Sequence, residues 1–267
     1  MGGQTQEDAA MSETPTGRFC WYELMTTNPD AAPTLYGAIA GWGTTPFEGA
    51  DPPYTMWTNG ETLIGGLMQF PQEAIDGGAP SHWLVHLSTP DVKATTAKAK
   101  ELGATVLMEM DVPEVGSFAI IADPQGAAFA TYQPTGDTPG HDDEPNMGEF
   151  SWSELATTDW QAAWSFYSEL FGWQETEQMD MGDMGMHQMF GRGAHPLGGM
   201  MNKPPEMPVA AWLFYIGVPD VADAVEKVKE SGGQVLSGPM EAPGGDMVAR
   251  CMGPEGVAFA VHSVAQG

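Results

Sequence analysis

The sequence contains an internal repeat, and this repeat constrains the fold more than any other feature. Trp21 and Trp152 are separated by the same length of chain as Tyr36 and Tyr167. Further pairs follow in the same order at nearly the same spacing: Gly41-Trp42 with Gly172-Trp173, Met56-Trp57 with Met189-Phe190, Gly65-Gly66 with Gly198-Gly199, Pro90-Asp91 with Pro219-Asp220, and Gly103 with Gly232. Pairs that keep their order along most of a chain indicate two copies of one domain.

The repeat sets the expected domain boundaries. The first copy spans residues 17–135 and the second spans residues 148–265. Residues 136–147 are rich in Pro, Gly and acidic side chains and lack an apolar face, which is typical of a linker. Residues 1–16 are polar and read as a disordered tail without the basic and apolar regions of a signal peptide.

Each copy shows the order strand, helix, strand, strand, strand twice. In the first copy a strand at residues 19–25 precedes a helix that we expect Asn28 to cap and Gly41 to end. In the second copy Asp159 and Gly172 are the corresponding cap and stop. Helices and strands that alternate in this way predict an α+β fold with two β-α-β-β-β modules in each domain.

The charge balance limits the partners. The chain has 36 acidic and nine basic residues, a net charge of −27. Such a chain repels polyanions, so we expect neither nucleic acid nor an anionic membrane as a partner. Two interpretations of the acidity stay open, namely a surface adapted to high salt, where screening relieves repulsion, and an acidic groove for a cationic ligand.

Cysteine use and hydropathy point to a cytoplasmic protein. Cys20 and Cys251 are far apart in the sequence and form no metal-binding or redox motif, which is typical of a reducing compartment. No apolar run approaches the roughly 20 residues that a membrane-spanning helix needs. The expected partner is a small molecule, and the chain is expected to be a monomer or a homodimer.

Several of these motifs resemble the vicinal oxygen chelate superfamily, which includes glyoxalase I, extradiol dioxygenases and bleomycin-resistance proteins. The matching motifs are Trp-x-Glu-Leu in the first strand, the Tyr-x4-Gly-Trp segment after it, the Gly-Gly pair, and Asp123-Pro124-Gln125-Gly126 before the last strand of the first copy. The second copy has Gly253-Pro254-Glu255-Gly256 instead. The resemblance implies two tandem glyoxalase-like domains, each with a curved sheet around a cup.

The resemblance also implies a divalent cation, held by one His or Glu from the first and last strand of each module. The side chains that we align with these positions bind no metal in either copy: Trp21, Gly66, Leu84 and Ala130, then Trp152, Gly199, Leu213 and Ala260. We therefore predict no metal site and no cofactor.

Side chains two residues further along the same strands point into the same cups. They are Glu23, Met68, His86 and Tyr132 in the first copy, and Glu154, Met201, Tyr215 and His262 in the second. A Glu and a His held close together can exchange protons, so Glu23, His86, Glu154 and Tyr215 are the catalytic candidates. The alternative is that the two glutamates only satisfy hydrogen bonds at the floor of each cup.

The remaining candidates belong to the walls of the cups. Trp21, Trp57, Trp152 and His187, together with Met68, Tyr132, Met201 and His262, are predicted to bind the ligand. Trp83 and Trp212 form a further pair of the repeat, which favours the core for both.

The sequence supports three functions. The first is an enzyme that converts a small organic molecule without the family metal, of the lyase, isomerase or hydroxylase type. The second is a protein that sequesters a drug or a metabolite, as bleomycin-resistance proteins do. The third is a metal-dependent glyoxalase or dioxygenase with atypical ligands. We favour the enzyme, with the first copy as the more active domain.

Overall fold

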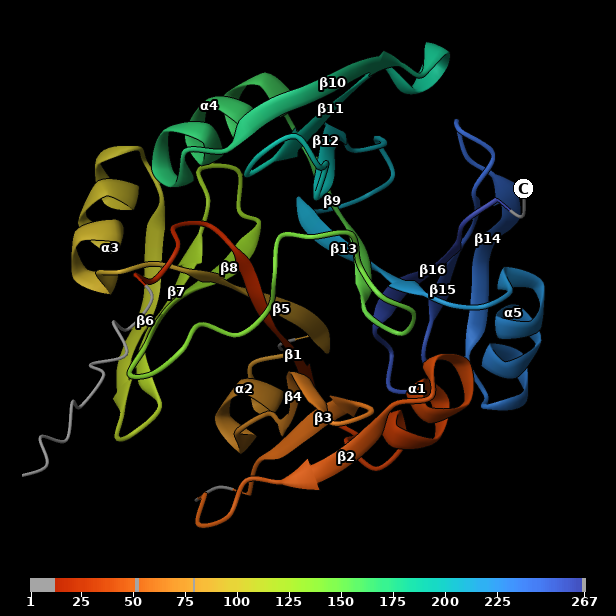
Figure 1. Ribbon diagram of the computed structural model, residues 1–267, viewed down its shortest axis with the longest axis horizontal. Helices are drawn as coiled ribbons and strands as arrows, with labels where there is room; N and C mark the ends of the chain where they lie inside the picture. The colour runs from red at the N-terminus through yellow and green to blue at the C-terminus, as the bar shows by residue number, and fades with distance from the viewer. Residues whose placement is uncertain (1–12, 51–52, 79, 266–267) are drawn as a thin grey trace, which may run out of the picture.

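The computed structural model describes residues 13–50, 53–78 and 80–265, and these residues form two sheets of eight strands (Figure 1). The strand order is β2-β3-β4-β1-β5-β8-β7-β6 in the first sheet and β10-β11-β12-β9-β13-β16-β15-β14 in the second. The two orders are equivalent, so the sequence repeat is also a structural repeat. This confirms the predicted α+β fold with tandem domains.

Four β-α-β-β-β modules make up the chain. The strands of the first sheet are β1 (Phe19–Thr26), β2 (Gly43–Pro46), β3 (Thr55–Asn59), β4 (Thr62–Gln69), β5 (His82–Ser88), β6 (Thr105–Val112), β7 (Gly116–Ala122) and β8 (Ala128–Pro134). Those of the second sheet are β9 (Phe150–Thr157), β10 (Gln174–Asp180), β11 (Met186–Gly191), β12 (Gly198–Asn202), β13 (Ala211–Gly217), β14 (Gln234–Glu241), β15 (Met247–Met252) and β16 (Ala258–Ser263). The helices are α1 (Ala32–Ala40), α2 (Gln72–Asp76), α3 (Val92–Glu101), α4 (Trp160–Phe171) and α5 (Val221–Glu230), with a 3-10 turn at Gly182–Met184.

The helix ends follow the sequence signals with one exception. Asp159 accepts hydrogen bonds from two backbone N–H groups of α4, and Gly41 and Gly172 end α1 and α4 in the left-handed conformation. The prediction that Asn28 caps α1 is wrong. The helix begins at Ala32 with Ala31 at the N-cap position and no side-chain cap, because Pro33 in the first turn sets the backbone without an N–H to satisfy.

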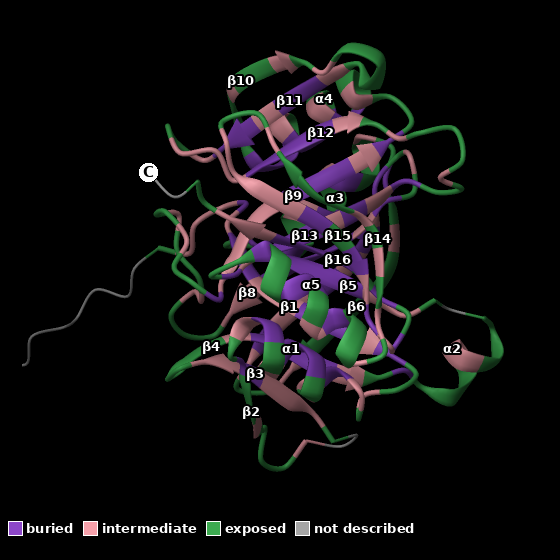
Figure 2. Cartoon of the chain, turned by 90° about the vertical axis from the view of Figure 1, so that its right-hand side faces the viewer, coloured by how far each residue is buried: buried purple, intermediate pink, exposed green. Residues whose placement is uncertain are grey.

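The helices pair across the two domains. Helix α1 contacts α5, and α3 contacts α4 (Figure 1). In Figure 2, α1 and α5 lie side by side over buried strands. Two reciprocal hydrogen bonds fix this arrangement, because Trp42 Nε1 donates to the carbonyl of Gly148 at 2.6 Å and Trp173 Nε1 donates to the carbonyl of Gly17 at 2.9 Å. The two domains therefore share one continuous apolar core.

Two buried carboxylates complete this core. Tyr167 of α4 donates a hydrogen bond to Asp123 at 3.1 Å, and Tyr36 of α1 donates one to Glu255 at 3.0 Å. Glu255 lies two residues beyond the repeat position of Asp123, which Gly253 occupies. A Cβ added to Gly253 would overlap the Glu255 carboxylate. This carboxylate thus fills the space that an aspartate side chain would need, and the second copy keeps an acid in this motif.

The segments outside the sheets are held by specific bonds. Residues 1–12 of the predicted tail lie outside the described residues, but Pro15 and Thr16 accept hydrogen bonds from Ser88 and from Arg192. This part of the tail therefore contacts both domains. In the predicted linker, Asp142 pairs with Arg18 of one domain and with Arg192 of the other.

Two further observations concern the chain as a whole. Among the described residues, no helix combines the length and apolar character that crossing a membrane requires. Cys20 and Cys251 are both buried and free.

Candidate functional site

Each sheet has one face covered by helices and one face free of them. In the first sheet, Leu24 and Val85 point toward the helices and belong to the shared core. Their neighbours Glu23 and His86 point to the opposite face, because successive strand residues alternate. We call this helix-free face the first cup, and the equivalent face of the second sheet, which contains Glu154, the second cup.

The register of the strands corrects the alignment of the family's metal positions. Ligands of one ion must lie close together on one face of the sheet. Glu23 pairs with Gly66, and His86 pairs with Ala130. Glu23 in turn pairs with Leu84, and His86 pairs with Trp21. Glu23 and His86 therefore lie diagonally opposite each other across the β1–β5 pair, on the same face of the sheet. The aligned residues Trp21 and Leu84 are thus not paired with Gly66 and Ala130, because cross-strand register cannot be read from one strand.

The second sheet has the same register. Glu154 pairs with Gly199, and Tyr215 pairs with Ala260. Both cups thus have a Gly and an Ala at the last-strand positions. They differ on the first strand of the second module, where the first cup has His86 on β5 and the second has Tyr215 on β13.

A chain of polar contacts runs through the first cup. Trp21 Nε1 donates a hydrogen bond to the Tyr54 oxygen at 2.9 Å, and the Tyr54 hydroxyl donates to Glu23 Oε2 at 3.4 Å. The same Glu23 oxygen lies 3.4 Å from His86 Nε2. Burial and the nearby Glu23 carboxylate raise the pKa of Tyr54 far above its usual value. Tyr54 is therefore a permanent hydrogen-bond donor to Glu23.

His86 is the most unusual group of the first cup. It is buried, and neither ring nitrogen has a hydrogen-bond partner among the described residues. The contact with Glu23 is close enough for an ion pair but does not have hydrogen-bond geometry. A buried polar group without a partner costs roughly 1–3 kcal/mol, and in native structures such groups are enriched where a ligand or a reaction uses them.

Aromatic rings form the wall beside His86. Phe118 and Tyr132 are stacked with their ring centroids 4.5 Å apart, and the edge of the His86 ring faces Phe118 at 5.6 Å. Burial raises the pKa of Tyr132 to about 12, and its hydroxyl donates to the carbonyl of Val115. This wall provides a flat apolar surface next to the Glu–His pair.

The second cup has a different set of groups around the same glutamate. Glu154 Oε1 accepts a hydrogen bond from Nη2 of Arg250 at 2.7 Å, and Oε2 accepts one from the Tyr215 hydroxyl at 3.3 Å. His187 Nε2 lies 3.9 Å from Oε2. Burial, together with Glu154, raises the pKa of Tyr215, so this hydroxyl remains protonated. Burial lowers the pKa of His187, outweighing the opposite effect of Glu154.

Two strand glycines make room for side chains of the neighbouring strand. A Cβ added to Gly66 would overlap the Tyr54 hydroxyl, and one added to Gly199 would overlap His187 Nε2. At the position where a metal-binding relative would have a ligand, each cup therefore contains the polar end of a side chain from an adjacent segment.

The structure brings most of the predicted site residues together. Trp21 and Tyr132 lie in the first cup, and Trp152 lies 6.1 Å from His187 in the second. Met68 and Met201 are half-buried, two residues beyond the glycines of their strands. Trp83 and Trp212 belong to the core, as expected.

Two predicted ligand contacts need correction. Trp57 is fully buried in the shared core and packs against Tyr36 and Trp42, so it faces the helices instead of the cup. His262 is bonded through both ring nitrogens, to Ser151 and to Asp246 at 3.0 Å each. The histidine that approaches Glu154 is His187.

Three residues of the cups were not among the predicted site residues: Tyr54, Phe118 and Arg250. Tyr54 had a signal, because it is the repeat partner of His187. The sequence also contained a signal for Arg250. It is one of only nine basic residues, and it alternates with buried residues on β15.

The family's cation does not fit these side chains. The residues paired with Gly66 and Ala130 supply Glu23 and His86 as donors in the first cup, and those paired with Gly199 and Ala260 supply Glu154 alone as an acidic or histidine donor in the second. Among the described residues, no group of three or more His, Cys, Asp or Glu side chains is arranged to hold a metal ion.

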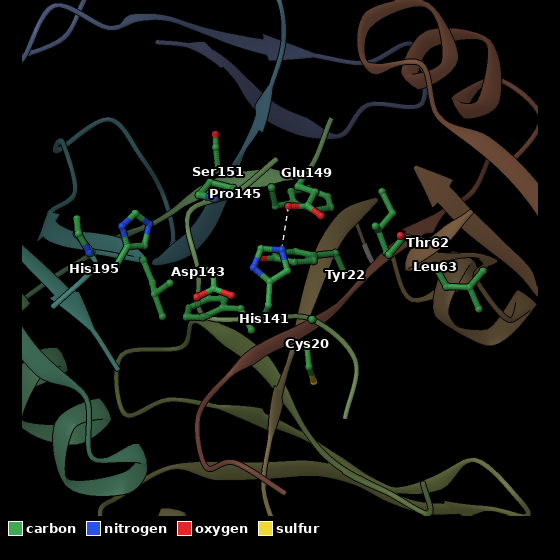
Figure 3. Close-up of a pocket in the computed structure, with 16 residues that line it drawn as sticks. Cys20, Tyr22, Thr62, Leu63, His141, Asp143, Pro145, Glu149, Ser151 and His195 are labelled. Atoms are coloured by element: carbon green, nitrogen blue, oxygen red, sulfur yellow. Dashed lines mark hydrogen bonds and ion pairs between the residues drawn. The ribbon is translucent and has the colours of Figure 1, made fainter. Parts of the chain in front are cut away.

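A separate cavity of about 210 Å³ lies between the two domains (Figure 3). Its walls come from β1, β4, β9, the linker and residues 195–197. Figure 3 shows His141 bonded to Glu149, a contact of 3.0 Å. Neither cup glutamate lines this cavity, so it is distinct from both cups.

Comparisons with known proteins agree with the fold and the repeat. A family model described as "Glyoxalase/Bleomycin resistance protein/Dioxygenase superfamily" matches residues 149–261, and one described as "Glyoxalase-like domain" matches residues 21–131. The chain therefore belongs to the vicinal oxygen chelate superfamily and contains two tandem domains of it.

Two curated relatives show how far the similarity extends. "Putative glyoxylase CFP32" of Mycobacterium bovis is 39% identical over 121 residues, which cover 45% of this chain and 45% of that protein. The match thus spans less than half of either protein. "Anthracycline biosynthesis protein DauV" of Streptomyces sp. (strain C5) is 28% identical over 272 residues, which cover 94% of both chains.

Solved structures share the architecture at low identity. A Mn(II)-bound glyoxalase from Novosphingobium aromaticivorans has a TM-score of 0.65 at 14% identity, covering 95% of this chain and 84% of that one. The 2,3-dioxygenase LapB from Pseudomonas sp. KL28 has a TM-score of 0.66 at 12% identity, covering 96% and 94%. At this identity the similarity concerns the fold alone.

Proposed function

We propose that this chain is a glyoxalase-like enzyme that converts a small organic molecule by proton transfer in the first cup, without a metal held at the family position. One observation carries the proposal. Glu23 and His86, the strand neighbours of Gly66 and Ala130, face each other at 3.4 Å and leave both nitrogens of His86 without a hydrogen-bond partner among the described residues.

The proposed reaction is a lyase- or isomerase-type proton transfer next to a carbonyl group. The Glu23 carboxylate takes a proton from carbon and becomes a carboxylic acid, and the C–H electron pair forms an enolate. His86, protonated, donates its proton to a second atom of the substrate. The proton on Glu23 then passes to His86, which restores both groups. Tyr54 stabilises the Glu23 carboxylate through its hydroxyl.

Proton exchange in heavy water tests this reaction. Protein treated with a chelator is incubated in D2O with a panel of α-hydroxy ketones and hemithioacetals, and deuterium incorporation is followed by proton NMR. General acid–base groups contribute about 10²- to 10⁴-fold to a rate. We therefore expect Glu23→Gln and His86→Gln to slow exchange at least about 100-fold.

A matched control lies outside the cups. His141 and Glu149 form another His–Glu pair, at 3.0 Å on the surface, and His141→Gln is expected to exchange at the wild-type rate. Exchange that survives in Glu23→Gln contradicts the proposal. Exchange that requires added Mn²⁺ in the wild type would instead support the metal-dependent alternative.

A second function is favoured by the aromatic wall of the first cup. The stacked Phe118 and Tyr132 rings offer a flat surface for a polycyclic aromatic ligand, and a full-length relative has a name that refers to anthracycline biosynthesis. In this alternative the chain sequesters the ligand. Mass spectrometry of an incubated ligand separates the two, because a sequestering protein returns it unchanged.

A further inference from the structure

Arg250 is the one residue that most distinguishes the second cup from the first. It lies on β15 and pairs with Ala260, whereas Ile120 of β7 pairs with the equivalent Ala130. The two positions correspond, so a charged side chain has replaced an aliphatic one at the same level of the sheet. In a chain with 36 acidic and nine basic residues, a basic side chain inside a cup needs an explanation.

The guanidinium group is bonded to Glu154 through one of its nitrogens. Its Nη2 donates to Glu154, whose side chain is 10% exposed, while 45% of the Arg250 side chain is exposed. The glutamate thus fixes the group, while nearly half of the arginine side chain stays open to solvent. A guanidinium carries five N–H donors, and this bond uses one nitrogen.

The ion pair is not required for burying the glutamate. Glu23 and Glu154 occupy equivalent positions and are equally buried, each 8% exposed. Glu23 has no arginine beside it and is satisfied by Tyr54 and by proximity to His86. A purely structural role for Arg250 therefore leaves its presence in only one cup unexplained.

One neighbour of Arg250 leaves a further polar atom available to an anionic group, and a second neighbour fixes Glu154. His187 Nε2 is buried and has no hydrogen-bond partner among the described residues. The Tyr215 hydroxyl donates to the other oxygen of Glu154 and so helps to fix the carboxylate that holds Arg250. The Trp152 indole adjoins His187 at 6.1 Å and supplies an apolar wall.

We propose that the second cup is a binding site for a small organic acid, whose carboxylate is held by the Arg250 guanidinium and whose apolar body packs toward Trp152. The guanidinium provides a fixed positive charge at the level where relatives bind their cation. Arginine suits this role because its planar donors match both oxygens of a carboxylate. The inference does not depend on proton transfer in the first cup.

Calorimetric titration of the full chain with benzoate and with benzamide tests the proposal. The two probes have nearly the same shape and differ in charge. We expect benzoate to bind at least about tenfold more tightly than benzamide, because a charge-assisted contact is stronger than a neutral one. Benzamide binding as tightly as benzoate overturns the proposal, and so does the absence of benzoate binding at millimolar concentration.

Variants locate the site. Arg250→Met is expected to weaken benzoate binding at least about tenfold, and Arg250→Lys to have an intermediate effect, since it keeps the charge but loses the fork. Lys229→Met removes one positive charge from exposed helix α5 and is expected to bind benzoate as the wild type does. Benzoate affinity that is unchanged in Arg250→Met contradicts the proposal.

A double variant removes the risk of misfolding. Arg250→Met leaves Glu154 buried without its cation, whereas Arg250→Met combined with Glu154→Gln leaves no unpaired charge. We expect the folded double variant to lose benzoate binding, and retained binding overturns the proposal. Benzoate binding that persists in Glu23→Gln, together with loss of proton exchange there, separates this site from the one proposed in the first cup.

Discussion

The two domains have the same strand order and the same central glutamate, yet each surrounds that glutamate differently. In the first cup Glu23 faces His86, and the polar tip beside Gly66 belongs to Tyr54. In the second cup Glu154 faces Tyr215 and Arg250, and a histidine takes the place of Tyr54. The histidine and the tyrosine beside the central glutamate have thus exchanged positions between the two cups.

The exchange shows which constraints the repeat preserves. Both copies keep the groups that the fold itself needs, such as the Trp residues that bond to Gly17 and Gly148 and the helix-ending glycines. The cups are free to diverge because their side chains contribute less to the shared core. A tandem repeat can thus provide two different sites on one backbone.

The largest stability difference between the domains is expected at the two buried core carboxylates. Asp123 accepts two backbone N–H bonds and the Tyr167 hydroxyl, whereas Glu255 accepts the Tyr36 hydroxyl and its Oε2 lacks a partner among the described residues. We expect Asp123→Ala to lower the free energy of unfolding by about 3 kcal/mol and Glu255→Ala by about 1 kcal/mol. Urea unfolding measures both. Equal losses of unfolding free energy would mean that the two carboxylates stabilise the fold equally.

A smaller effect is expected from the pH dependence of Glu255. Burial raises the pKa of Glu255 above its ordinary value of 4.5, although the Tyr36 bond opposes this. The native state then binds the proton more tightly than the unfolded state. The stability from this group is therefore complete below pH 4.5 and is lost as the pH rises through the raised pKa.

Glu255→Gln stays neutral and avoids this loss. We expect the variant to match the wild type near pH 4 and to exceed it at pH 7 by up to about 1 kcal/mol in unfolding free energy. Asp123→Asn is the matched change in the first domain and should lose stability at both pH values, because asparagine has one acceptor oxygen where Asp123 uses two. If the difference in unfolding free energy between Glu255→Gln and the wild type did not vary with pH, the raised pKa of Glu255 would be contradicted.

An effect of similar size concerns His187. Burial lowers the pKa of His187 below 6.5, with Arg250 contributing in the same direction. Its neutral form is favoured in the folded state, so the stability it provides is present above pH 6.5 and is lost as the pH falls through the lowered pKa.

Replacing His187 by tyrosine, the equivalent residue of the first cup, isolates the contribution of the histidine to stability. His187→Tyr does not titrate in this range, so the wild type should lose up to about 1 kcal/mol relative to the variant between pH 7.5 and pH 5. Chemical denaturation at several pH values measures the difference, and NMR of the histidine ring follows the titration. A ring that titrates at pH 6.5 or above would contradict the burial argument.

Local patterns in the sequence were sufficient to predict the repeat, the four modules and the face of most strands. A strand alternates every second residue and a helix ends at a glycine whatever lies nearby, so these features need no knowledge of the partners. They were enough to place Glu23 with His86 and Glu154 with Tyr215 on one face. They also separated Trp83 and Trp212 from the cups.

The level at which these residues meet depends instead on how the strands pair. Glu23, Gly66 and His86 come from strands far apart in sequence, and their register depends on turns and bulges that alternation does not reveal. The same reason explains Trp57, whose strand face could be read only once β3 had its partners. Arg250 reaches a glutamate 96 residues away, a contact that exists only because β9 and β15 close around the same cup.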